Sequence, residues 1–295
     1  MKLLVILGPT ASGKSDLAVF IAKKFKGEIV SADSRQIYRG LDIGSGKITK
    51  REMHNIPHHM IDIANPKRTI SVTSYAEGAH KVIQKIAQKD KLPILCGGTG
   101  FYISAVVDNI KFPEVPPDQK LRKKLSGLSN EQLFQVLKQK DPARARTIDA
   151  QNSRRLVRAL EIIHTQGHVP PLSYKKSLYN TLLIGINPGT EGLAEKIRVR
   201  LHKRFRQGML QEVRQLHENG VAWKRLDALG LEYRFVAAYL QNIITRKDME
   251  EKLRLAIGHY AKRQMTWFRR NRRILWFHPE QRSEISSAVE NFLES

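Results

Sequence analysis

The sequence contains one cysteine and lacks any long apolar run. Cys96 has no second cysteine with which to form an intrachain disulfide, and its apolar neighbours favour a buried position over a nucleophilic role. No apolar stretch approaches the roughly 20 residues of a membrane-spanning helix. The apolar run at 3–7 ends at Gly8, too soon for the apolar segment of a signal peptide. We therefore expect a soluble, cytoplasmic protein without a membrane partner.

Acidic residues are scarce relative to basic ones. The 295 residues include 51 Lys and Arg against 28 Asp and Glu, which gives a net charge of +23. A chain this basic attracts polyanions, so nucleic acid or an anionic membrane surface is the expected class of partner. Apolar residues make up 41% of the chain, which argues against general disorder. A basic enzyme without a polyanionic partner is the plainer alternative.

The first hundred residues alternate short apolar runs with amphipathic stretches, a pattern typical of a parallel sheet flanked by helices. Strands are predicted at 3–7, 28–32 and 92–96, with a further element at 59–63. Helices are predicted at 14–25, at 71–87 with Ser71 as the N-cap, and after the glycine-rich run 97–100. This alternation indicates an α/β fold.

Prolines mark a change of organisation further along the chain. Pro113, Pro116 and Pro117 precede a charged, helix-rich stretch that Pro170 and Pro171 end. A strand predicted at 181–186 returns to the sheet, and helices are predicted from 191 onward. We expect an α/β core of residues 1–113 and 179–295, interrupted by a helical insertion at 114–178.

A phosphate-binding loop is the strongest single motif. The pattern G-x-x-x-x-G-K-[ST] is matched, between a predicted strand and a predicted helix, by Gly8, Pro9, Thr10, Ala11, Ser12, Gly13, Lys14 and Ser15. Glycines let backbone N–H groups surround phosphate oxygens, and the helix N-terminus adds positive potential. Lys14 supplies a mobile cation, and the Ser15 hydroxyl can bind Mg²⁺. The motif makes the core a P-loop NTPase-like parallel sheet.

The usual partner of this loop is a nucleoside triphosphate, but one part of that machinery is missing. The strand 92–96 runs into Gly97 and Gly98, with no Asp at its tip to serve as a second magnesium partner. Another phosphorylated substrate is therefore possible.

A carboxylate follows the second predicted strand. Asp33 lies at the carboxyl end of 28–32, where open α/β sheets place their ligands. Beside the phosphate loop it could take a proton from a nucleophile, cap the next turn, or bind Mg²⁺. Spacing alone leaves these three roles open.

Taken together, the motifs closely resemble the tRNA dimethylallyltransferases, also called tRNA isopentenyltransferases. Besides the phosphate loop, the resemblance rests on 33–44 (DSRQIYRGLDIG), 57–62 (PHHMID), 97–102 (GGTGFY), Arg204-Phe205 with Met209 and Glu212-Val213, and 262–269 (KRQMTWFR). These segments span the chain in the family's order. One departure is 229–234 (LGLEYR), where many members carry a shorter motif, so the contacts of that segment stay open.

The resemblance implies a reaction and a set of site residues. A dimethylallyl group passes from dimethylallyl diphosphate to N6 of adenine 37, next to the anticodon in the stem-loop of tRNA, with Mg²⁺ as cofactor. The diphosphate would lie at Gly8–Ser15, with Mg²⁺ near Ser15, a further cation from Arg204, and Asp33 as general base. The tRNA contacts that the resemblance implies are Asp33, Ser34, Arg35, Gln36, Thr99, Arg122, Gln151, Asn152, Ser153, Arg154 and Arg155.

Elementary chemistry agrees with these roles. An exocyclic amine is a poor nucleophile because its lone pair is delocalised into the ring, so a nearby proton acceptor helps. An allylic carbon ionises readily once cations stabilise the departing diphosphate. A base inside a folded loop must also be extruded before it can react, and the helical insertion is our candidate for holding the stem-loop.

Two runs without acidic residues, 196–206 and 254–273, suit a phosphate backbone. In the second run Met265 and Phe268 are predicted to face inward while the cations face RNA. His58 and His59 lack a third ligand at suitable spacing, which favours structural histidines over a metal site.

Three rival functions remain at this point. A P-loop small-molecule kinase would use ATP, with Asp33 as the base for a hydroxyl. A free-adenylate isopentenyltransferase would share the core but would not need the insertion. An RNA-binding module with a degenerate loop would not need intact Lys14, Ser15 and Asp33.

Overall fold

The computed structural model describes residues 1–174, 176–189 and 191–295. The chain divides into two compact units, one of Met1–Asn109 with Lys176–Ser295 and the other of Ile110–Lys175. These limits lie close to the sequence-based limits of 113/114 and 178/179. Among the described residues, none belongs to a helix that is both long and apolar enough to cross a membrane.

The first unit is built on a parallel sheet. Within the described residues it has six strands in the order β3-β2-β4-β1-β7-β8. Their bounds are β1 Lys2–Leu7, β2 Gly27–Ser31, β3 His58–His59, β4 Leu92–Gly97, β7 Asn180–Ile186 and β8 Leu275–Phe277. Leu7 at the end of β1 pairs with Gly97 of β4 and Gly185 of β7. The loops that follow these strands therefore leave from one edge of the sheet.

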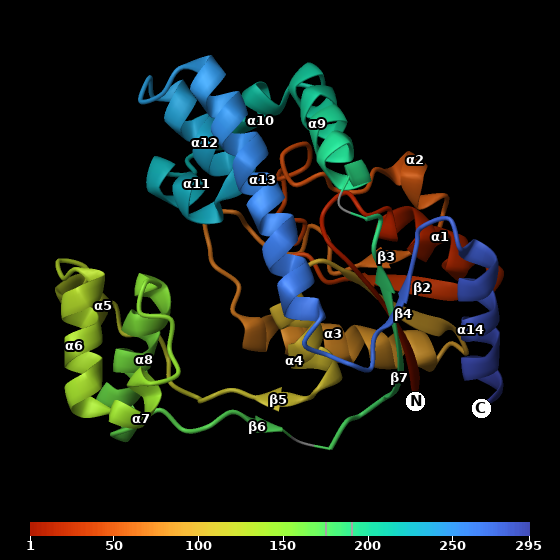
Figure 1. Ribbon diagram of the computed structural model, residues 1–295, viewed down its shortest axis with the longest axis horizontal. Helices are drawn as coiled ribbons and strands as arrows, with labels where there is room; N and C mark the ends of the chain where they lie inside the picture. The colour runs from red at the N-terminus through yellow and green to blue at the C-terminus, as the bar shows by residue number, and fades with distance from the viewer. Residues whose placement is uncertain (175, 190) are drawn as a thin grey trace. The chain divides into compact units, whose positions relative to one another are not determined.

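Helices cover both faces of the sheet, as a parallel sheet requires. They are α1 Lys14–Lys24, α3 Val72–Ala87, α4 Gly100–Val107 and α14 Arg282–Glu294, whereas the short α2 Lys50–Met53 has no buried residue. Ile21 of α1 and Val289 of α14 belong to one core cluster with Ile6 and Ile94. Helices α3 and α4 lie on the other side of the sheet (Figure 1), where the rings of Tyr75 and Tyr102 stack with centroids 3.9 Å apart. The predicted P-loop NTPase-like α/β core is confirmed.

A group of helices follows β7 in the first unit. They are α9 Glu191–Arg206, α10 Met209–Glu218, α11 Trp223–Leu229, α12 Leu231–Leu240 and α13 Arg246–Phe268. Helix α12 packs against α10, α11 and α13, and α13 also packs against α9 and α4. The long α13 therefore runs from this group down to the sheet (Figure 1).

Two local expectations were wrong. The sequence pattern predicted helices throughout the region after 191, but β8 adds a strand beside β7, because three residues give no alternation to detect. The element predicted at 59–63 is the two-residue strand β3 instead. Met60 and Asp62 have φ angles of 62° and 56°, and this left-handed backbone ends the strand.

The second unit is a small helical bundle closed by a two-stranded antiparallel ribbon. Its elements are β5 Ile110–Lys111, α5 Gln119–Leu125, α6 Asn130–Lys140, α7 Pro142–Ala145, α8 Ser153–Gln166 and β6 Ser173–Tyr174. Leu133, Leu137, Leu156 and Leu160 form the centre of its core. The Ser129 and Asn152 side chains cap α6 and α8, so the unit has a core and helix caps of its own.

Candidate active site

The phosphate loop joins β1 to α1 at the centre of the sheet. Gly13 is the N-cap of α1 with φ 86°, a left-handed backbone that favours glycine. A Cβ added to Gly8 would lie 2.7 Å from the Ile186 carbonyl oxygen. The Ser12 Oγ atom is buried and has no hydrogen-bond partner in the part of the chain that the structure describes. A buried hydroxyl of this kind is uncommon, and a bound phosphate oxygen would satisfy it.

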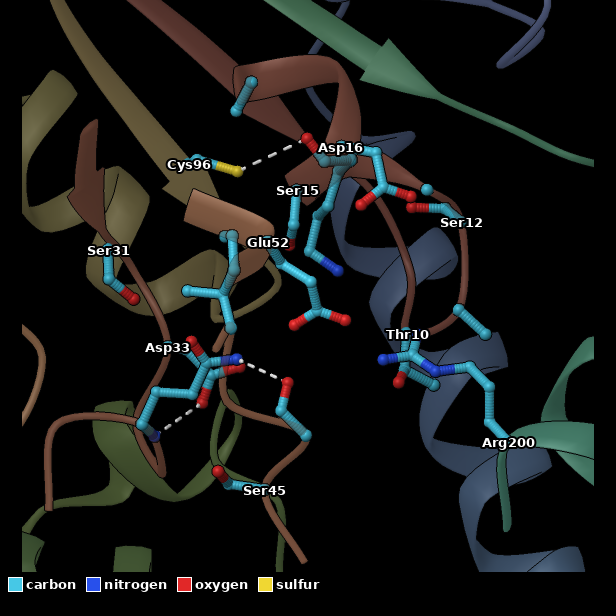
Figure 2. A pocket seen from close by; sticks show the side chains of 18 of the residues that line it. Thr10, Ser12, Ser15, Asp16, Ser31, Asp33, Ser45, Glu52, Cys96 and Arg200 are labelled. Carbon is cyan, nitrogen blue, oxygen red and sulfur yellow. Dashed lines mark hydrogen bonds between the residues drawn. The ribbon is translucent and has the colours of Figure 1, made fainter. Parts of the chain in front are cut away.

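A cavity of about 530 Å³, the phosphate-loop cavity, opens beside this loop. Thr10 to Ser15 line it together with Asp33 and Gln36 from the β2 edge and Arg200 and Arg204 from α9. Figure 2 shows Thr10 and Asp33 on opposite sides of this space, with the Glu52 carboxylate between them. Sequence-distant motifs thus meet in one cavity.

Asp33 lies two residues after the end of β2, and its carboxylate is held by the turn that follows. Its Oδ1 atom accepts hydrogen bonds from the N–H groups of Arg35 at 2.8 Å and Gln36 at 3.3 Å. Its Oδ2 atom accepts none from the described residues, so one oxygen remains available for a proton. The carboxylate therefore has a fixed direction and an open acceptor.

The cations of the cavity differ in how they are held. Lys14 donates to the Pro9 carbonyl at 3.1 Å, and burial lowers the pKa of its ammonium group although Cys96 and Asp33 act in the opposite direction. Burial lowers the pKa of the Arg200 guanidinium too, with a smaller contribution from Arg204. These groups form a cationic wall that an anionic substrate would neutralise.

Arg204 belongs to a buried network that shapes the loop after Leu41. Its guanidinium donates to Glu232 at 2.6 Å and to the Gly44 carbonyl at 3.2 Å. Burial raises the pKa of Glu232, and Arg204 opposes this shift. A Cβ on Gly46 would lie 2.0 Å from an Arg204 nitrogen, and the φ angle of Gly46 is 61°. This left-handed backbone favours glycine where the loop meets the arginine.

Glu212 holds the same loop from α10. Its carboxylate accepts the N–H groups of Ile43 at 2.5 Å and Gly44 at 3.0 Å, and the Tyr233 hydroxyl donates to it at 3.0 Å. Glu232 and Tyr233 belong to the 229–234 segment whose contacts the sequence left open. The structure places that segment behind the loop, where it fixes Arg204 and Glu212.

Thr99, which the resemblance implies as a tRNA contact, follows β4 and contacts the residue after Asp33. Its Oγ1 atom accepts the Ser34 N–H at 3.0 Å, and its own N–H donates to the Ala32 carbonyl at 3.1 Å. Tyr260 of α13 is beside it; burial raises the pKa of this phenol to about 12, and a hydrogen bond with Thr99 works against that rise. The loops after β2 and β4 are therefore tied together at the site.

The remaining predicted tRNA contacts lie in the second unit. Arg122 pairs with Glu161 in a bidentate geometry, at 2.7 Å and 2.9 Å. Gln151 to Arg155 form the turn before α8 and its first residues, and Arg155 is exposed there. Within the second unit, Arg122 is therefore held by a carboxylate, whereas Arg155 extends into solvent.

Comparison with known proteins decides the family. A sequence model of the IPP transferase family matches residues 36–271. The chain belongs to the IPP transferase family. The chain is 44% identical over 271 residues to the tRNA dimethylallyltransferase 1 of Geotalea uraniireducens, covering 92% of this chain and 89% of the relative. It is 39% identical to the tRNA dimethylallyltransferase of Bacillus mycoides, covering 99% and 96% of the two chains.

Solved structures agree with this family. The chain superposes on the tRNA isopentenylpyrophosphate transferase of Bacillus halodurans with a TM-score of 0.77, at 33% identity, covering 99% of this chain and 97% of that one. A eukaryotic dimethylallyltransferase acting on tRNA gives a TM-score of 0.80 at 24% identity, over 98% of this chain and 77% of that one, which adds support for the fold alone.

In the described part of the chain, the cavity of this IPP transferase has few ligands of its own for a magnesium ion, so the substrate and water would have to supply the others. The described residues contain no group of three or more His, Cys, Asp or Glu that could hold a metal. The Ser15 hydroxyl and the Asp16 and Glu52 carboxylates do line the cavity (Figure 2). Oxygen ligands supplemented by substrate phosphates and water are the usual environment of Mg²⁺.

Several site residues of the IPP transferase were missed in the sequence. Arg200 stands four residues before Arg204, so the two share a helix face, and this spacing could have revealed it. The sequence pattern predicted Met265 and Phe268 facing inward and assigned no position to Gln264. The structure buries Gln264 and Phe268, while Met265 is half-buried.

Cys96 and the histidines at 58 and 59 lie where their structural interpretation from the sequence can be examined. Cys96 is buried as expected, and burial raises the pKa of its thiol to about 12. His59 contacts the buried carboxylate of Glu28 at 2.7 Å, and His58 lies 2.8 Å from the Ile56 carbonyl. Both histidines thus make structural contacts.

Proposed function

We propose that this IPP transferase transfers a dimethylallyl group from dimethylallyl diphosphate to N6 of adenine 37, next to the anticodon of tRNA, giving N6-dimethylallyladenosine. One observation carries the proposal: Asp33 and the phosphate loop line the same cavity. A proton acceptor and a diphosphate site are the two parts that this transfer needs. The relatives named tRNA dimethylallyltransferase support the choice of substrates.

Asp33 would accept the proton of the N6 amine as its nitrogen attacks the allylic carbon. The N–H groups of Arg35 and Gln36 hold Oδ1, which directs the other oxygen of the carboxylate. A base whose carboxylate is already oriented suits a weakly nucleophilic amine, because the entropic cost of bringing the two groups together is lower than for free reactants.

The leaving diphosphate would lie at Thr10–Ser15 with Lys14, Arg200 and Arg204 around it. The partial desolvation of Lys14 and Arg204 strengthens their attraction for an anion. The unpartnered hydroxyl of Ser12 would accept or donate one further hydrogen bond. Mg²⁺ held at Ser15 would supply additional charge neutralisation for the diphosphate.

Transfer RNA would contact the exposed basic side chains of the chain. Lys262 and Arg263 of α13 are exposed, as are Arg269 and Arg270 just after the helix. The same helix carries Tyr260 beside Thr99. We assign Ser34, Arg35, Gln36 and the insertion residues Arg122 and Gln151 to Arg155 to the same partner. An enzyme that modifies tRNA would work in the cytoplasm.

The rival functions have weaker support. A small-molecule kinase would usually carry an acidic magnesium partner at the end of the strand beside the phosphate loop, but β4 ends at Gly97 and Gly98 follows. A free-adenylate isopentenyltransferase leaves the second unit and the exposed basic face of α13 without a use.

A mass measurement tests the proposal against its rivals. An anticodon stem-loop is incubated with dimethylallyl diphosphate and Mg²⁺, and its adenosine is analysed by mass spectrometry. Parallel reactions contain adenosine monophosphate as acceptor, or ATP in place of the donor. We expect one added prenyl group on the stem-loop adenosine. Prenylation of the free nucleotide alone would favour the adenylate rival, and ATP consumption without prenylation would favour the kinase.

A further inference from the structure

Gln264 is a polar side chain of α13 that is only 7% exposed and touches two separate loops. Its Oε1 atom accepts the Thr10 N–H at 2.9 Å, and its Nε2 atom donates to the Gly98 carbonyl at 2.7 Å. Burying an amide is unfavourable unless both of its ends are hydrogen-bonded. An amide can accept from an N–H group and donate to a carbonyl at the same time. The contacts with Thr10 and Gly98 therefore favour a glutamine at this position.

One of these two loops would bind the diphosphate of the donor, and the other contacts the segment that holds the proposed base. Thr10 begins the cavity-lining part of the phosphate loop, and the next residue, Ala11, has a left-handed φ of 62°. Gly98 precedes Thr99, which accepts the Ser34 N–H beside Asp33. Gln264 therefore connects the diphosphate site to the loop after β4, and that loop in turn contacts the loop after β2 that carries the proposed base.

Glycines leave room for this contact. A Cβ added to Gly98 would lie 2.4 Å from the Gln264 Nε2 atom. A Cβ on Gly100 would lie 2.3 Å from the Trp267 Cδ1 atom, one helical turn further along α13. The loop after β4 is thus shaped to receive α13 at close range, with little space for the amide to move.

We propose that Gln264 is a positioning residue that holds the phosphate loop in its diphosphate-binding conformation and keeps it in register with Asp33. Because the Thr10 N–H is bound by Gln264, one end of the loop is anchored by the protein and not by the ligand. The identity of the donor rests on the proposed function, whereas the effect on diphosphate binding does not.

Three variants test the role. Gln264→Met keeps the length of the side chain and removes both hydrogen bonds, and Gln264→Glu keeps only an acceptor for Thr10. Gln84→Glu, on the exposed side of α3, is the matched control for the charge change. Each protein is titrated calorimetrically with inorganic diphosphate in the presence of Mg²⁺. Donor KM and kcat, the Kd for a tRNA stem-loop and thermal unfolding are measured alongside.

Gln264→Met should weaken diphosphate binding about 10-fold, since two net hydrogen bonds of ordinary strength are lost. Gln264→Glu should fall between Gln264→Met and the wild type. Donor KM should rise with the diphosphate Kd, while the Kd for the stem-loop stays unchanged. A merely structural role would lower the unfolding temperature without changing the affinity of the folded fraction, and that outcome would overturn the proposal.

A double-mutant cycle provides an independent check. Gly98→Ala pushes a methyl group against the Gln264 amide, so it should also weaken diphosphate binding, and less so when Gln264 is already Met. Additive effects would refute the contact as the cause. Wild-type protein that binds diphosphate but transfers no prenyl group would remove the proposed function and leave this inference standing. If the wild type prenylates tRNA but Gln264→Met binds diphosphate with unchanged affinity, the inference about Gln264 is wrong and the proposed function stands.

Discussion

Each unit contains an arginine paired with a buried glutamate, and the two pairs differ in how much of the arginine reaches solvent. In the phosphate-loop cavity the Arg204 side chain is 12% exposed beside Glu232. In the second unit the Arg122 side chain is 41% exposed while Glu161 is fully buried. In both, a buried carboxylate fixes the guanidinium.

The difference in exposure separates two uses of the same residue type. A desolvated cation acts strongly on a small anion at close range and is screened little by salt. An exposed cation contributes little by itself but adds to a field that a long polyanion can follow. We expect the cavity to govern turnover and the exposed basic side chains to govern tRNA affinity, and the predictions below test that division.

Asp33→Asn should have the largest effect. The change keeps the shape of the side chain but removes the proton acceptor, so kcat should fall by roughly 10²–10⁴-fold. Binding of donor and tRNA should change much less, because the amide oxygen can still accept from Arg35 and Gln36. Single-turnover prenylation of a stem-loop across a magnesium series measures this. Near-normal turnover would remove Asp33 from the base role, and rescue by extra Mg²⁺ would make it a metal ligand.

Lys14→Ala should come next. Removal of this cation from the diphosphate should reduce turnover by about 10²-fold and weaken donor binding, since a positioned charge is lost from the leaving group. The Kd for tRNA should stay the same. Lys23→Ala, an exposed position on α1, is the control. Unchanged turnover at saturating donor would contradict the assignment of the phosphate loop.

Local motifs explain why much of the cavity could be predicted. The phosphate loop, Asp33 and Thr99 each lie within a few residues of a strand end, and the topology of a parallel sheet brings strand ends together. Because each of them follows a predicted strand, their proximity at one edge of the sheet could be predicted from the sequence. The fold class was predictable for the same reason, because buried strands and amphipathic helices leave periodic patterns.

Residues that act through long-range contacts could not be predicted in this way. Gln264 and Thr10 are separated by more than two hundred residues, and Glu212 reaches a loop that is also distant in sequence. No local pattern shows that a polar residue on a basic helix turns inward. Only the packing of α13 on the loop after β4 distinguishes Gln264 from its exposed neighbours.

Arg122→Ala should act on the stability of the second unit. It leaves the buried Glu161 carboxylate with the Asp118 N–H and Arg158, and losing one charged partner should destabilise the unit by roughly 2–3 kcal/mol. Hydrogen exchange of amides in 110–175 measures this locally, as two units need not unfold together. Arg155→Ala is the control, and equal protection in both variants would mean that Arg122 does not hold Glu161.

Arg155→Gln should have the smallest effect and sharpen the division most. The side chain is exposed at the start of α8, so its expected contribution is one contact with the phosphate backbone. The slope of log affinity against log salt should become shallower by about one for each contact removed. Lys262→Gln on α13 should do the same, and affinity at moderate salt should fall only a few fold.

Lys14→Ala is the contrasting variant for this measurement. If cavity cations act on the donor alone, it should leave the salt slope of tRNA binding unchanged while turnover falls. A slope that shifts with Lys14 but not with Arg155 or Lys262 would reverse the two roles. In that case tRNA phosphates would enter the phosphate-loop cavity, and the exposed basic residues would be solvated surface. The slopes of the three variants, measured on one stem-loop, therefore decide which cations meet RNA.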